Sequence, residues 1–225
     1  MNLENLKAEA AKKAVGYIES GMRVGLGTGS TAKHAILEIA RRVQTGELKN
    51  IVGVATSVES ENLARENGIL IEPLDARMIN LAIDGADEIA PNLDLIKGLG
   101  AALLREKLVE RQAEEFIVVA DYTKMVNHLG EKSLLPIEIA RFGFEATVER
   151  LKKYGEPILR RKQGEIVLTD NGNYIADLRF VPTDAANLAQ DLKLLTGVVE
   201  TGFFIGMATR AVVAFENEVK EFTKT

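Results

Sequence analysis

The sequence predicts an α/β protein in which a Rossmann-like, doubly wound, mostly parallel sheet carries a smaller inserted α+β domain of ferredoxin-like type. Three observations support this prediction. Short apolar segments alternate with amphipathic segments up to about residue 120, polar motifs follow the ends of several apolar segments, and the alternation changes near residue 131. The chain has 225 residues, of which 46% are hydrophobic, so it can bury a core and hold a large domain with a small one.

Helix and strand signals alternate through the expected larger domain. Apolar residues spaced three and four apart predict helices, and short apolar runs beside glycine or acidic residues predict strands. The expected elements are a helix at 3–20, a strand at 22–27, a helix capped by Ser30 or Thr31 and reaching 43, a strand at 51–55, a helix capped by Ser57 and ending near 68, strands at 69–71 and 79–83, a helix at 101–111 and a strand at 116–120. Ligands of parallel sheets bind beyond the carboxyl ends of strands, so the motifs at 27–31, 84–88 and 121–124 are expected to converge.

A different order of elements begins near residue 131. The expected elements are a strand at 135–140, a helix at 143–154, a strand at 158–161, a hairpin at 165–180 that turns at Asn171-Gly172, a helix at 185–195 and a strand at 198–205. A last strand at 211–215 is expected to return to the main sheet. We therefore expect a larger Rossmann-like domain formed by 1–130 plus 207–225 and a smaller α+β domain formed by 131–206.

Composition argues against several classes of function. The formal net charge of −5 and the lack of a dense Lys and Arg run disfavour nucleic-acid binding. The chain has no Cys and only 2 His, so disulfides, thiolate chemistry and a His-rich metal centre are not expected. The first residues lack the apolar core of a signal peptide and no stretch has the length of a membrane span, so we expect a cytoplasmic protein with no membrane partner.

The segment GLGTGSTA (residues 25–32), here called the glycine loop, joins an expected strand to an expected helix. Its backbone N–H groups and the positive end of the helix dipole suit a phosphate, and the hydroxyls of Thr28, Ser30 and Thr31 add donors. The loop departs from the dinucleotide fingerprint GxGxxG because Ser30 holds the third glycine position, and it lacks the lysine of a P-loop. A terminal monophosphate therefore fits better than NAD or ATP, while a tight turn with a Ser or Thr cap explains the same residues without a ligand.

Acidic and basic side chains follow later strands. The segment IDGADE (residues 83–88) brings three carboxylates to a strand end, where Gly85 permits a sharp turn. Such carboxylates can bind a divalent metal, polarise sugar hydroxyls, act as a base, or form only a solvated turn. Lys97 precedes glycines whose N–H groups can stabilise an oxyanion. Taken alone, Glu106 is typical of a surface salt bridge and Lys124 of a solvated loop.

Four motifs in this order and spacing, GTGSTA, IDGADE, KGLGAALLREK and ADYTK, resemble those of the A-type ribose-5-phosphate isomerases. The resemblance covers nearly the whole chain, including DNGN and GVVETGFF. It implies an aldose–ketose isomerase that interconverts D-ribose 5-phosphate and D-ribulose 5-phosphate through ring opening and a cis-enediolate, in the non-oxidative branch of the pentose phosphate pathway. It also implies a small-molecule sugar phosphate as partner, no cofactor, no metal, and a homodimer or homotetramer.

The resemblance also implies roles for individual residues. Glu106 matches the general base, Asp84 is placed to assist ring opening, and Lys97 holds the charge and orientation of Asp84. Asp87 fixes a sugar hydroxyl. The residues that match substrate-binding positions are Lys7, Thr28, Gly29, Ser30, Thr31, Asp84, Gly85, Ala86, Asp87, Lys97, Gly98, Leu99, Gly100 and Lys124. The family commonly has glycine where this chain has Leu99. A positive φ would cost leucine about 1 kcal/mol or more, so we expect ordinary backbone angles there, with only the N–H group on offer.

Two other classes of function fit part of these patterns. A sugar-phosphate-sensing effector domain without catalysis would share the architecture, but such domains are attached to a helix-turn-helix, and here the first helix leads almost directly into the glycine loop. A nucleotide-dependent oxidoreductase or transferase would need a nucleotide fingerprint, which the glycine loop does not match. Turnover of ribose 5-phosphate would separate the isomerase from both alternatives.

Overall fold

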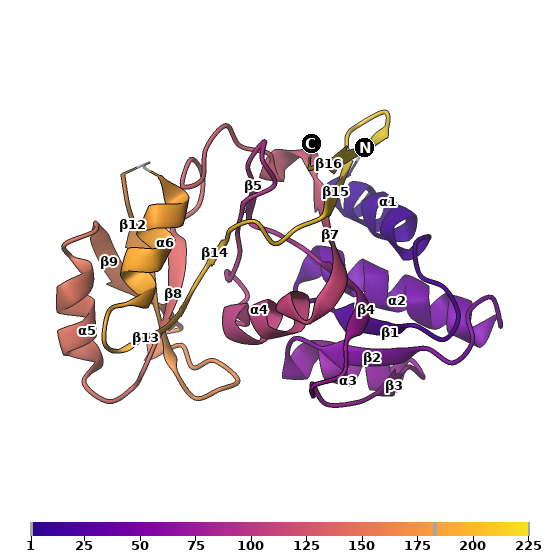
Figure 1. Ribbon diagram of the computed structural model, residues 1–225, viewed down its shortest axis with the longest axis horizontal. Coiled ribbons are helices and arrows are strands. Elements are labelled where there is room, and N and C mark those ends of the chain that lie inside the picture. The colour runs from indigo at the N-terminus through magenta and orange to yellow at the C-terminus, as the bar shows by residue number, and fades with distance from the viewer. Residues whose placement is uncertain (1, 182–183, 225) are drawn as a thin grey trace. The chain divides into compact units, whose positions relative to one another are not determined.

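The computed structural model describes residues 2–181 and 184–224 and divides the chain into two compact units (Figure 1). The first unit contains Met1–Ala86, Arg105–Lys124 and Met207–Thr225, and the second contains Asp87–Leu104 and Met125–Gly206. Each unit has its own sheet and its own hydrophobic core. None of the helices in the described ranges is long and apolar enough to cross a membrane.

The sheet of the first unit is doubly wound. Its order is β16-β15-β7-β4-β1-β2-β3, and every neighbouring pair except β15–β16 is parallel. The strands are β1 (Arg23–Leu26), β2 (Val52–Ala55), β3 (Leu70–Ile71), β4 (Ile79–Asp84), β7 (Ala113–Asp121), β15 (Arg210–Ala214) and β16 (Val219–Thr223). A parallel sheet with its first strand in the middle and β4 on the other side of it from β2 is the Rossmann order, so the predicted fold class is confirmed.

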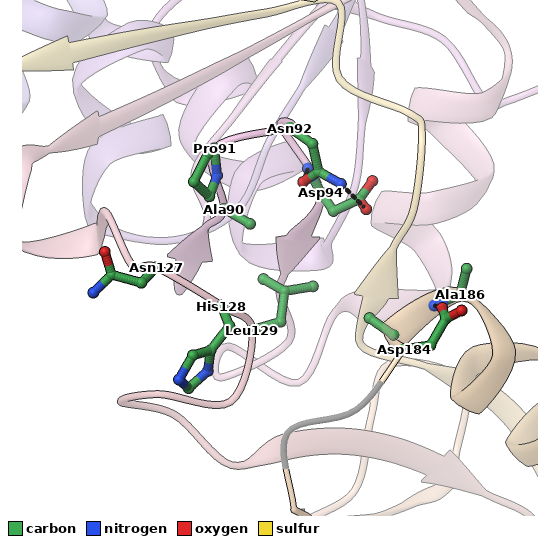
Figure 2. Close-up of a pocket in the computed structure, with 10 residues that line it drawn as sticks. Ala90, Pro91, Asn92, Asp94, Asn127, His128, Leu129, Asp184 and Ala186 are labelled. Carbon is green, nitrogen blue, oxygen red and sulfur yellow. Dashed lines mark hydrogen bonds between the residues drawn. The ribbon is translucent and has the colours of Figure 1, made fainter.

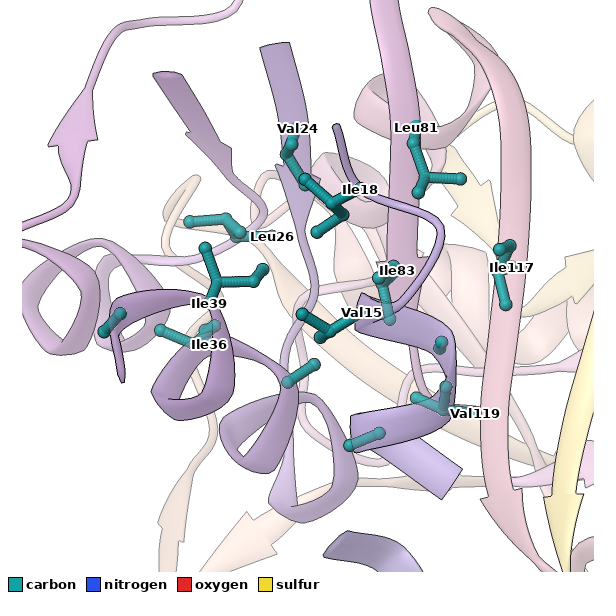
Figure 3. Packing of buried hydrophobic residues seen from close by; sticks show 14 of the residues in the cluster. Val15, Ile18, Val24, Leu26, Ile36, Ile39, Leu81, Ile83, Ile117 and Val119 are labelled. Atoms are coloured by element: carbon teal, nitrogen blue, oxygen red, sulfur yellow. The ribbon is translucent and has the colours of Figure 1, made fainter. Parts of the chain in front are cut away.

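Helices cover both faces of this sheet. They are α1 (Leu3–Val15), α2 (Ser30–Gln44), α3 (Val58–Glu66) and most of α4 (Leu103–Arg111). Side chains of α1, α2 and α3 share one core with the sheet, and Figure 3 shows Val15, Ile36 and Ile39 beside Val24, Leu26, Leu81, Ile83, Ile117 and Val119. Side chains alternate along a strand, so Gly25 faces the other side, where α4 packs. A Cβ atom on Gly25 would lie 2.9 Å from Val109 Cγ1, so glycine lets α4 approach the sheet closely.

The second unit contains a ferredoxin-like β-α-β-β-α-β arrangement. Its antiparallel sheet has the order β13-β8-β12-β9. In chain order the elements are β8 (Leu135–Ile139), α5 (Phe144–Leu151), β9 (Glu156–Leu159), β12 (Tyr174–Arg179), α6 (Ala185–Lys193) and β13 (Val198–Thr201). Leu151 and Leu192 from the two helices pack against Ile137 and Leu178 of the sheet. The expected smaller α+β fold is therefore present.

The division of the chain differs from the expected one. Residues 87–104 and 125–130 belong to the second unit rather than the first. One reason is a three-stranded antiparallel sheet in which β6 (Leu95–Ile96) pairs with both β5 (Glu88–Ile89) and β14 (Phe203–Phe204). Strands of two residues carry no periodic signal, so their pairing cannot be read from the sequence.

Several element boundaries also differ from those expected. The first helix ends at Val15, earlier than predicted, and the expected strand at 198–205 is interrupted at Gly202. A Cβ atom on Gly202 would lie 2.4 Å from the carbonyl oxygen of Lys97, so the backbones approach closely at this break. The edge strand β16 was not predicted.

The expected hairpin at 165–180 forms only in part. Its turn is present, because the Gly172 N–H group donates to the Thr169 carbonyl at 2.9 Å. However, β11 (Glu165–Ile166) pairs with β10 (Arg161–Lys162) in a hairpin of its own, while β12 pairs with β8 and β9.

Candidate active site

The glycine loop connects β1 to α2, as predicted. Gly29 is the N-cap of α2, with a φ of 101°, and no side chain caps the helix. The prediction that Ser30 or Thr31 provides the cap is wrong, since α2 begins at Ser30 and the capping position is a glycine. The N-terminus of this helix of 15 residues has no side-chain cap, so its first N–H groups and the helix dipole can interact with an anion.

Thr28 makes its hydrogen bonds to other residues of the first unit. Its N–H group donates to Asp84 Oδ1 at 2.9 Å. Its hydroxyl lies 2.6 Å from Thr56 Oγ1 and 2.8 Å from Ser57 Oγ, and Ser60 Oγ donates to the Gly27 carbonyl at 2.6 Å. These contacts tie the end of β1 to the start of α3. The Thr28 hydroxyl, predicted as a phosphate donor, therefore has neighbours of its own, and sequence reasoning recognised Ser57 only as a helix cap.

Asp84 ends β4, beside β1, and its side chain is only 1% exposed. Besides the Thr28 N–H group, its Oδ1 accepts the N–H group of Gly85 at 2.6 Å. The carboxylate approaches the glycine loop so closely that a Cβ atom on Gly27 would lie 2.1 Å from Oδ1. Gly85, by contrast, has no left-handed φ, and a Cβ atom there would meet nothing nearer than 3.9 Å. Gly27, and not Gly85, is therefore the glycine whose missing side chain shapes this corner.

Glu106 lies on α4 and is 4% exposed. It stands one turn before Val109, which packs on the sheet, so it does not have the exposed position of a surface salt-bridge residue. Glu110, one turn after Glu106, is equally buried at 3% exposure, and nothing in the sequence singled it out. Buried carboxylates take positions that periodicity assigns to apolar residues, which hides the inner face of α4 from sequence analysis. Since burying a carboxylate is costly, such a group has a specific role to explain.

The turn after β7 carries Lys124. Residues Tyr122–Lys124 form a short 3₁₀ helix, η1, which is shaped by Asp121: its Oδ1 accepts the Thr123 N–H group at 3.0 Å and the Thr123 hydroxyl as well. Lys124 is half-buried. Because β7, β4 and β1 are adjacent and parallel, the expected convergence of the first unit's motifs at one end of the sheet is met by the glycine loop, Asp84 and η1.

Lys7 lies on α1. Its Nζ is 2.7 Å from Glu4 Oε1, and His34 Nε2 is 3.1 Å from Glu4 Oε2. The hydrogen bond from Lys7, followed by the one from His34, lowers the pKa of Glu4. Lys7 thus has a carboxylate partner on its own helix.

The second unit holds Asp87 and the segment of residues 97–100, here called the 97–100 turn. The Leu99 N–H group donates to Asp87 Oδ2 at 3.0 Å, and the Asp87 N–H group donates to the Ile96 carbonyl at 2.8 Å. Leu99 lies outside the left-handed region, as expected for leucine, whereas Gly98 has a φ of 113° and Ala101 one of 60°. The Leu99 N–H group, expected to be offered to the substrate, thus binds a carboxylate of its own unit.

Lys97 and Glu88 have different surroundings in the second unit. Lys97 is 2% exposed, with Nζ 5.4 Å from the centroid of the Phe204 ring, a distance typical of a cation–π contact. The Glu88 carboxylate accepts the N–H groups of Gly130 and Lys132, each at 2.6 Å, and of Ser133 at 2.5 Å. Glu88 thereby anchors a loop, which removes it from the metal-binding alternative raised for IDGADE.

Within residues 2–181 and 184–224, no group of three or more His, Asp or Glu side chains is arranged to hold a metal ion. A cavity of about 420 Å³ in the second unit is lined by none of the predicted site residues (Figure 2). Its acidic side chains are occupied: Asp94 accepts from Gly206 N–H and Asn92 Nδ2, each at 2.7 Å, and Asp184 caps α6.

Comparisons with known proteins agree over the whole chain. The family model for ribose 5-phosphate isomerase A (phosphoriboisomerase A) matches residues 52–218. The protein is 56% identical to ribose-5-phosphate isomerase A of Deinococcus radiodurans over 100% of both chains. It is 44% identical to that of Gloeobacter violaceus, covering 99% of this chain and 98% of the relative.

Solved structures give the same result. A D-ribose-5-phosphate isomerase in complex with phospho-erythronic acid superposes with a TM-score of 0.96 at 40% identity, over 99% of this chain and 100% of the other. The ribose 5-phosphate isomerase A of Methanocaldococcus jannaschii gives a TM-score of 0.94 at 37% identity, over 98% of this chain and 99% of the other. The fold and these relatives define an α/β enzyme of the isomerase class. The chain belongs to the ribose 5-phosphate isomerase A family.

Proposed function

We propose that this protein interconverts D-ribose 5-phosphate and D-ribulose 5-phosphate, and that Glu106 is the base that moves the proton. One observation carries the proposal. A glutamate only 4% exposed lies on α4, in the same unit as a glycine loop that leads to an uncapped helix N-terminus. A buried carboxylate in the unit that also carries an anion-binding helix end suits proton abstraction from a bound sugar phosphate.

The phosphate is the anchoring group in this proposal. The first N–H groups of α2 bind it, and the helix dipole adds about half a unit of positive charge. Gly29, Ser30 and Thr31 supply these groups, and Lys124 adds a positive charge. Lys7 contributes to the same electrostatic field from α1.

The proton transfers follow from the substrate's chemistry. Ribose 5-phosphate is mostly a closed ring, so a proton must first move between the anomeric hydroxyl and the ring oxygen. Asp84, held by the Thr28 and Gly85 N–H groups, has a fixed orientation for that step. Glu106 then removes the proton from C2, which gives a cis-enediolate, and returns a proton to C1, while the proton of the C2 hydroxyl passes to the oxygen on C1. One carboxylate serves both carbons because the two positions share a face of the enediolate.

The ligand of a similar protein supports an enediolate intermediate. One similar structure is titled as a complex with phospho-erythronic acid. That molecule combines a phosphate, hydroxyl groups and a planar carboxylate, and the carboxylate has the shape and charge of an enediolate. A site that accepts it would stabilise the proposed intermediate.

The finer assignments extend the proposal. Asp87, Lys97, Gly98, Leu99 and Gly100 are proposed as substrate-binding residues of the second unit, together with Gly85 and Ala86 of the first. We further propose that the enzyme is a cytoplasmic homodimer or homotetramer of the non-oxidative pentose phosphate pathway, needing neither cofactor nor metal.

The test is turnover of ribose 5-phosphate by the purified protein in a buffer containing a metal chelator. The wild-type protein should form ribulose 5-phosphate. Glu106→Gln should lower kcat by about 10³-fold with KM nearly unchanged, because it removes the proton acceptor and keeps the shape. Glu110→Gln, on the same helix and equally buried, is the matched control and should keep kcat within about threefold.

Three results would contradict the proposal. Binding of ribose 5-phosphate without turnover would favour the sensing module. Near-normal turnover by Glu106→Gln would exclude that residue as the base. Activity that is lost on chelation and restored by Mg²⁺ would require a metal.

A further inference from the structure

Arg160 lies just beyond β9, and its guanidinium joins two distant segments of the second unit. On one side, Nε donates to Asp177 Oδ2 at 2.8 Å and Nη2 donates to Asp177 Oδ1. On the other side, Nη1 donates to the Gly98 carbonyl at 2.9 Å and to the Leu99 carbonyl at 3.0 Å. The side chains of Arg160 and Asp177 are only 13% and 14% exposed. Four hydrogen bonds thus fix this guanidinium in a site largely shielded from water.

The two carbonyls held by Arg160 determine where two N–H groups point. A peptide bond is planar and trans, so its C=O and N–H groups point in opposite directions. The Gly98 carbonyl shares a peptide with the Leu99 N–H group, and the Leu99 carbonyl shares one with the Gly100 N–H group. Fixing both oxygens toward Arg160 therefore aims both N–H groups away from it. The Leu99 N–H group meets Asp87 Oδ2 at 3.0 Å, which shows where this side of the turn faces.

We propose that Arg160, held by Asp177, is a positioning residue of the isomerase: it sets the peptides at 98–99 and 99–100, and through them Asp87 and the Gly100 N–H group, for the substrate. The inference rests on the proposed function, which assigns Asp87 and the 97–100 turn to substrate binding. The Gly98 carbonyl also accepts the Ala101 N–H group at 3.0 Å, so Arg160 and the turn's own backbone together fix this oxygen. Arginine suits this role because its planar fork offers five donors, whereas the point charge of lysine cannot reach the carboxylate and both carbonyls in the same geometry.

The first experiment compares two neighbouring arginines. Arg160→Ala should lower kcat by about 10²-fold, because a displacement near 1 Å in a positioned group costs about that much, while KM should change less than kcat. Arg161→Ala is the matched control: Arg161 is exposed and donates to the Gly164 carbonyl at 2.8 Å, outside the turn, so kcat should stay within about threefold. Arg160→Lys should remain defective, and millimolar guanidinium should restore part of the activity of Arg160→Ala.

A second variant separates positioning from folding. Arg160→Ala leaves the Asp177 carboxylate without its guanidinium, which should lower the unfolding temperature. Removing that carboxylate as well, in Arg160→Ala/Asp177→Ala, should restore part of the stability and leave kcat low. If kcat recovers together with stability, or if Arg160→Ala keeps kcat within about threefold of wild type, the positioning role is refuted.

Amide hydrogen exchange gives a readout independent of turnover. In the substrate-free protein, Arg160→Ala should speed exchange in a peptide covering residues 97–103 and leave peptides from β1 and β4 unchanged. Unchanged exchange in residues 97–103 would overturn the inference even if the isomerase activity is established. Faster exchange in a protein that does not isomerise ribose 5-phosphate would show that Arg160 holds the 97–100 turn and would contradict the proposed function instead.

Discussion

The glycine loop of the first unit and the 97–100 turn of the second unit reach a fixed backbone by different means. In the glycine loop the geometry comes from adjacent elements: β1 enters, α2 leaves, and the Asp84 carboxylate fills the space where Gly27 has no side chain. In the 97–100 turn it comes from a side chain that is 61 residues away from Leu99 in the chain, namely Arg160. One loop is shaped by backbone and close approach, and the other by a guanidinium.

The difference shows what each loop can tolerate. The glycine loop depends on the missing side chain of Gly27, because a Cβ atom there would displace the Asp84 carboxylate that occupies the space. The 97–100 turn depends on two carbonyl oxygens, which every residue type provides. This explains why leucine can stand at residue 99, where the family commonly has glycine: its φ is ordinary and only its backbone groups are used.

The largest effect is expected at Gly27. In Gly27→Ala the new Cβ atom would lie 2.1 Å from Asp84 Oδ1, so the carboxylate must move. We expect kcat/KM to fall by about 10²-fold. The comparison variant is Gly53→Ala, whose Cβ would meet Leu26 Cδ1 at 2.6 Å and Ile71 Cδ1 at 2.7 Å, both apolar core atoms. Overpacking there should cost about 1–3 kcal/mol of stability, with kcat nearly normal. Steady-state kinetics and thermal unfolding of both variants test this, and equal kcat losses would show that Asp84 is not what Gly27 accommodates.

Smaller effects are expected in the 97–100 turn, where adding a side chain at residue 98 should matter and removing the one at residue 99 should not. Gly98→Ala imposes a φ of 113° on alanine and brings its Cβ to 3.1 Å from Leu103 and Pro136, so kcat/KM should fall by about tenfold. Leu99→Gly keeps the N–H and C=O groups and should change kcat/KM by less than about threefold. Kinetics of the two variants side by side check the claim. A large loss of kcat/KM in Leu99→Gly with little loss in Gly98→Ala would mean that the turn depends on the leucine side chain rather than on its backbone conformation.

The smallest effect concerns acid stability of the first unit. Hydrogen bonds from Arg41, and then from Arg42, lower the pKa of Glu38 on α2 to about 2 from its ordinary 4.5. A lowered carboxyl pKa stabilises the fold above pH 4.5, and this stabilisation disappears as the pH falls toward 2. Glu38→Gln should therefore lower the free energy of unfolding by about 1 kcal/mol at pH 7, and the difference from wild type should vanish near pH 2. Urea unfolding at several pH values measures this, with the exposed Glu9→Gln as control; a difference that grows at low pH would contradict the assigned cause.

The features of this fold that the sequence could predict are those set by neighbours in the chain. Features set by neighbours in the chain were accessible: the strand–helix alternation, the Ser57 cap and the place of the glycine loop follow from local spacing and residue type. Features set by distant neighbours were not. Nothing in the order of residues pairs Arg160 with residue 98, or places the Glu88 carboxylate on the N–H groups of residues 130–133.

Buried charge was the second obstacle. Glu106 and Glu110 occupy the inner face of α4, where periodicity leads one to expect apolar residues, so the helix appeared to have a polar surface. The resemblance to a family assigned Glu106 a role that its spacing did not, and the structure shows this residue to be buried. The Gly29 N-cap was missed because Ser is ordinarily preferred as a cap and stands next in the sequence, whereas in the structure it is the first residue of the helix.

Proton transfer at C2 of the sugar is the central step of the proposed reaction, and isotope incorporation measures it directly. Ribose 5-phosphate is incubated with the protein in D₂O and followed by NMR, with Glu106→Gln in parallel. We expect the wild-type protein to give ribulose 5-phosphate carrying deuterium at C1, and the variant to give almost none in the same time. Equal incorporation by the variant, or equal rates of product formation by the two proteins, would contradict the claim that Glu106 moves a proton through an enediolate.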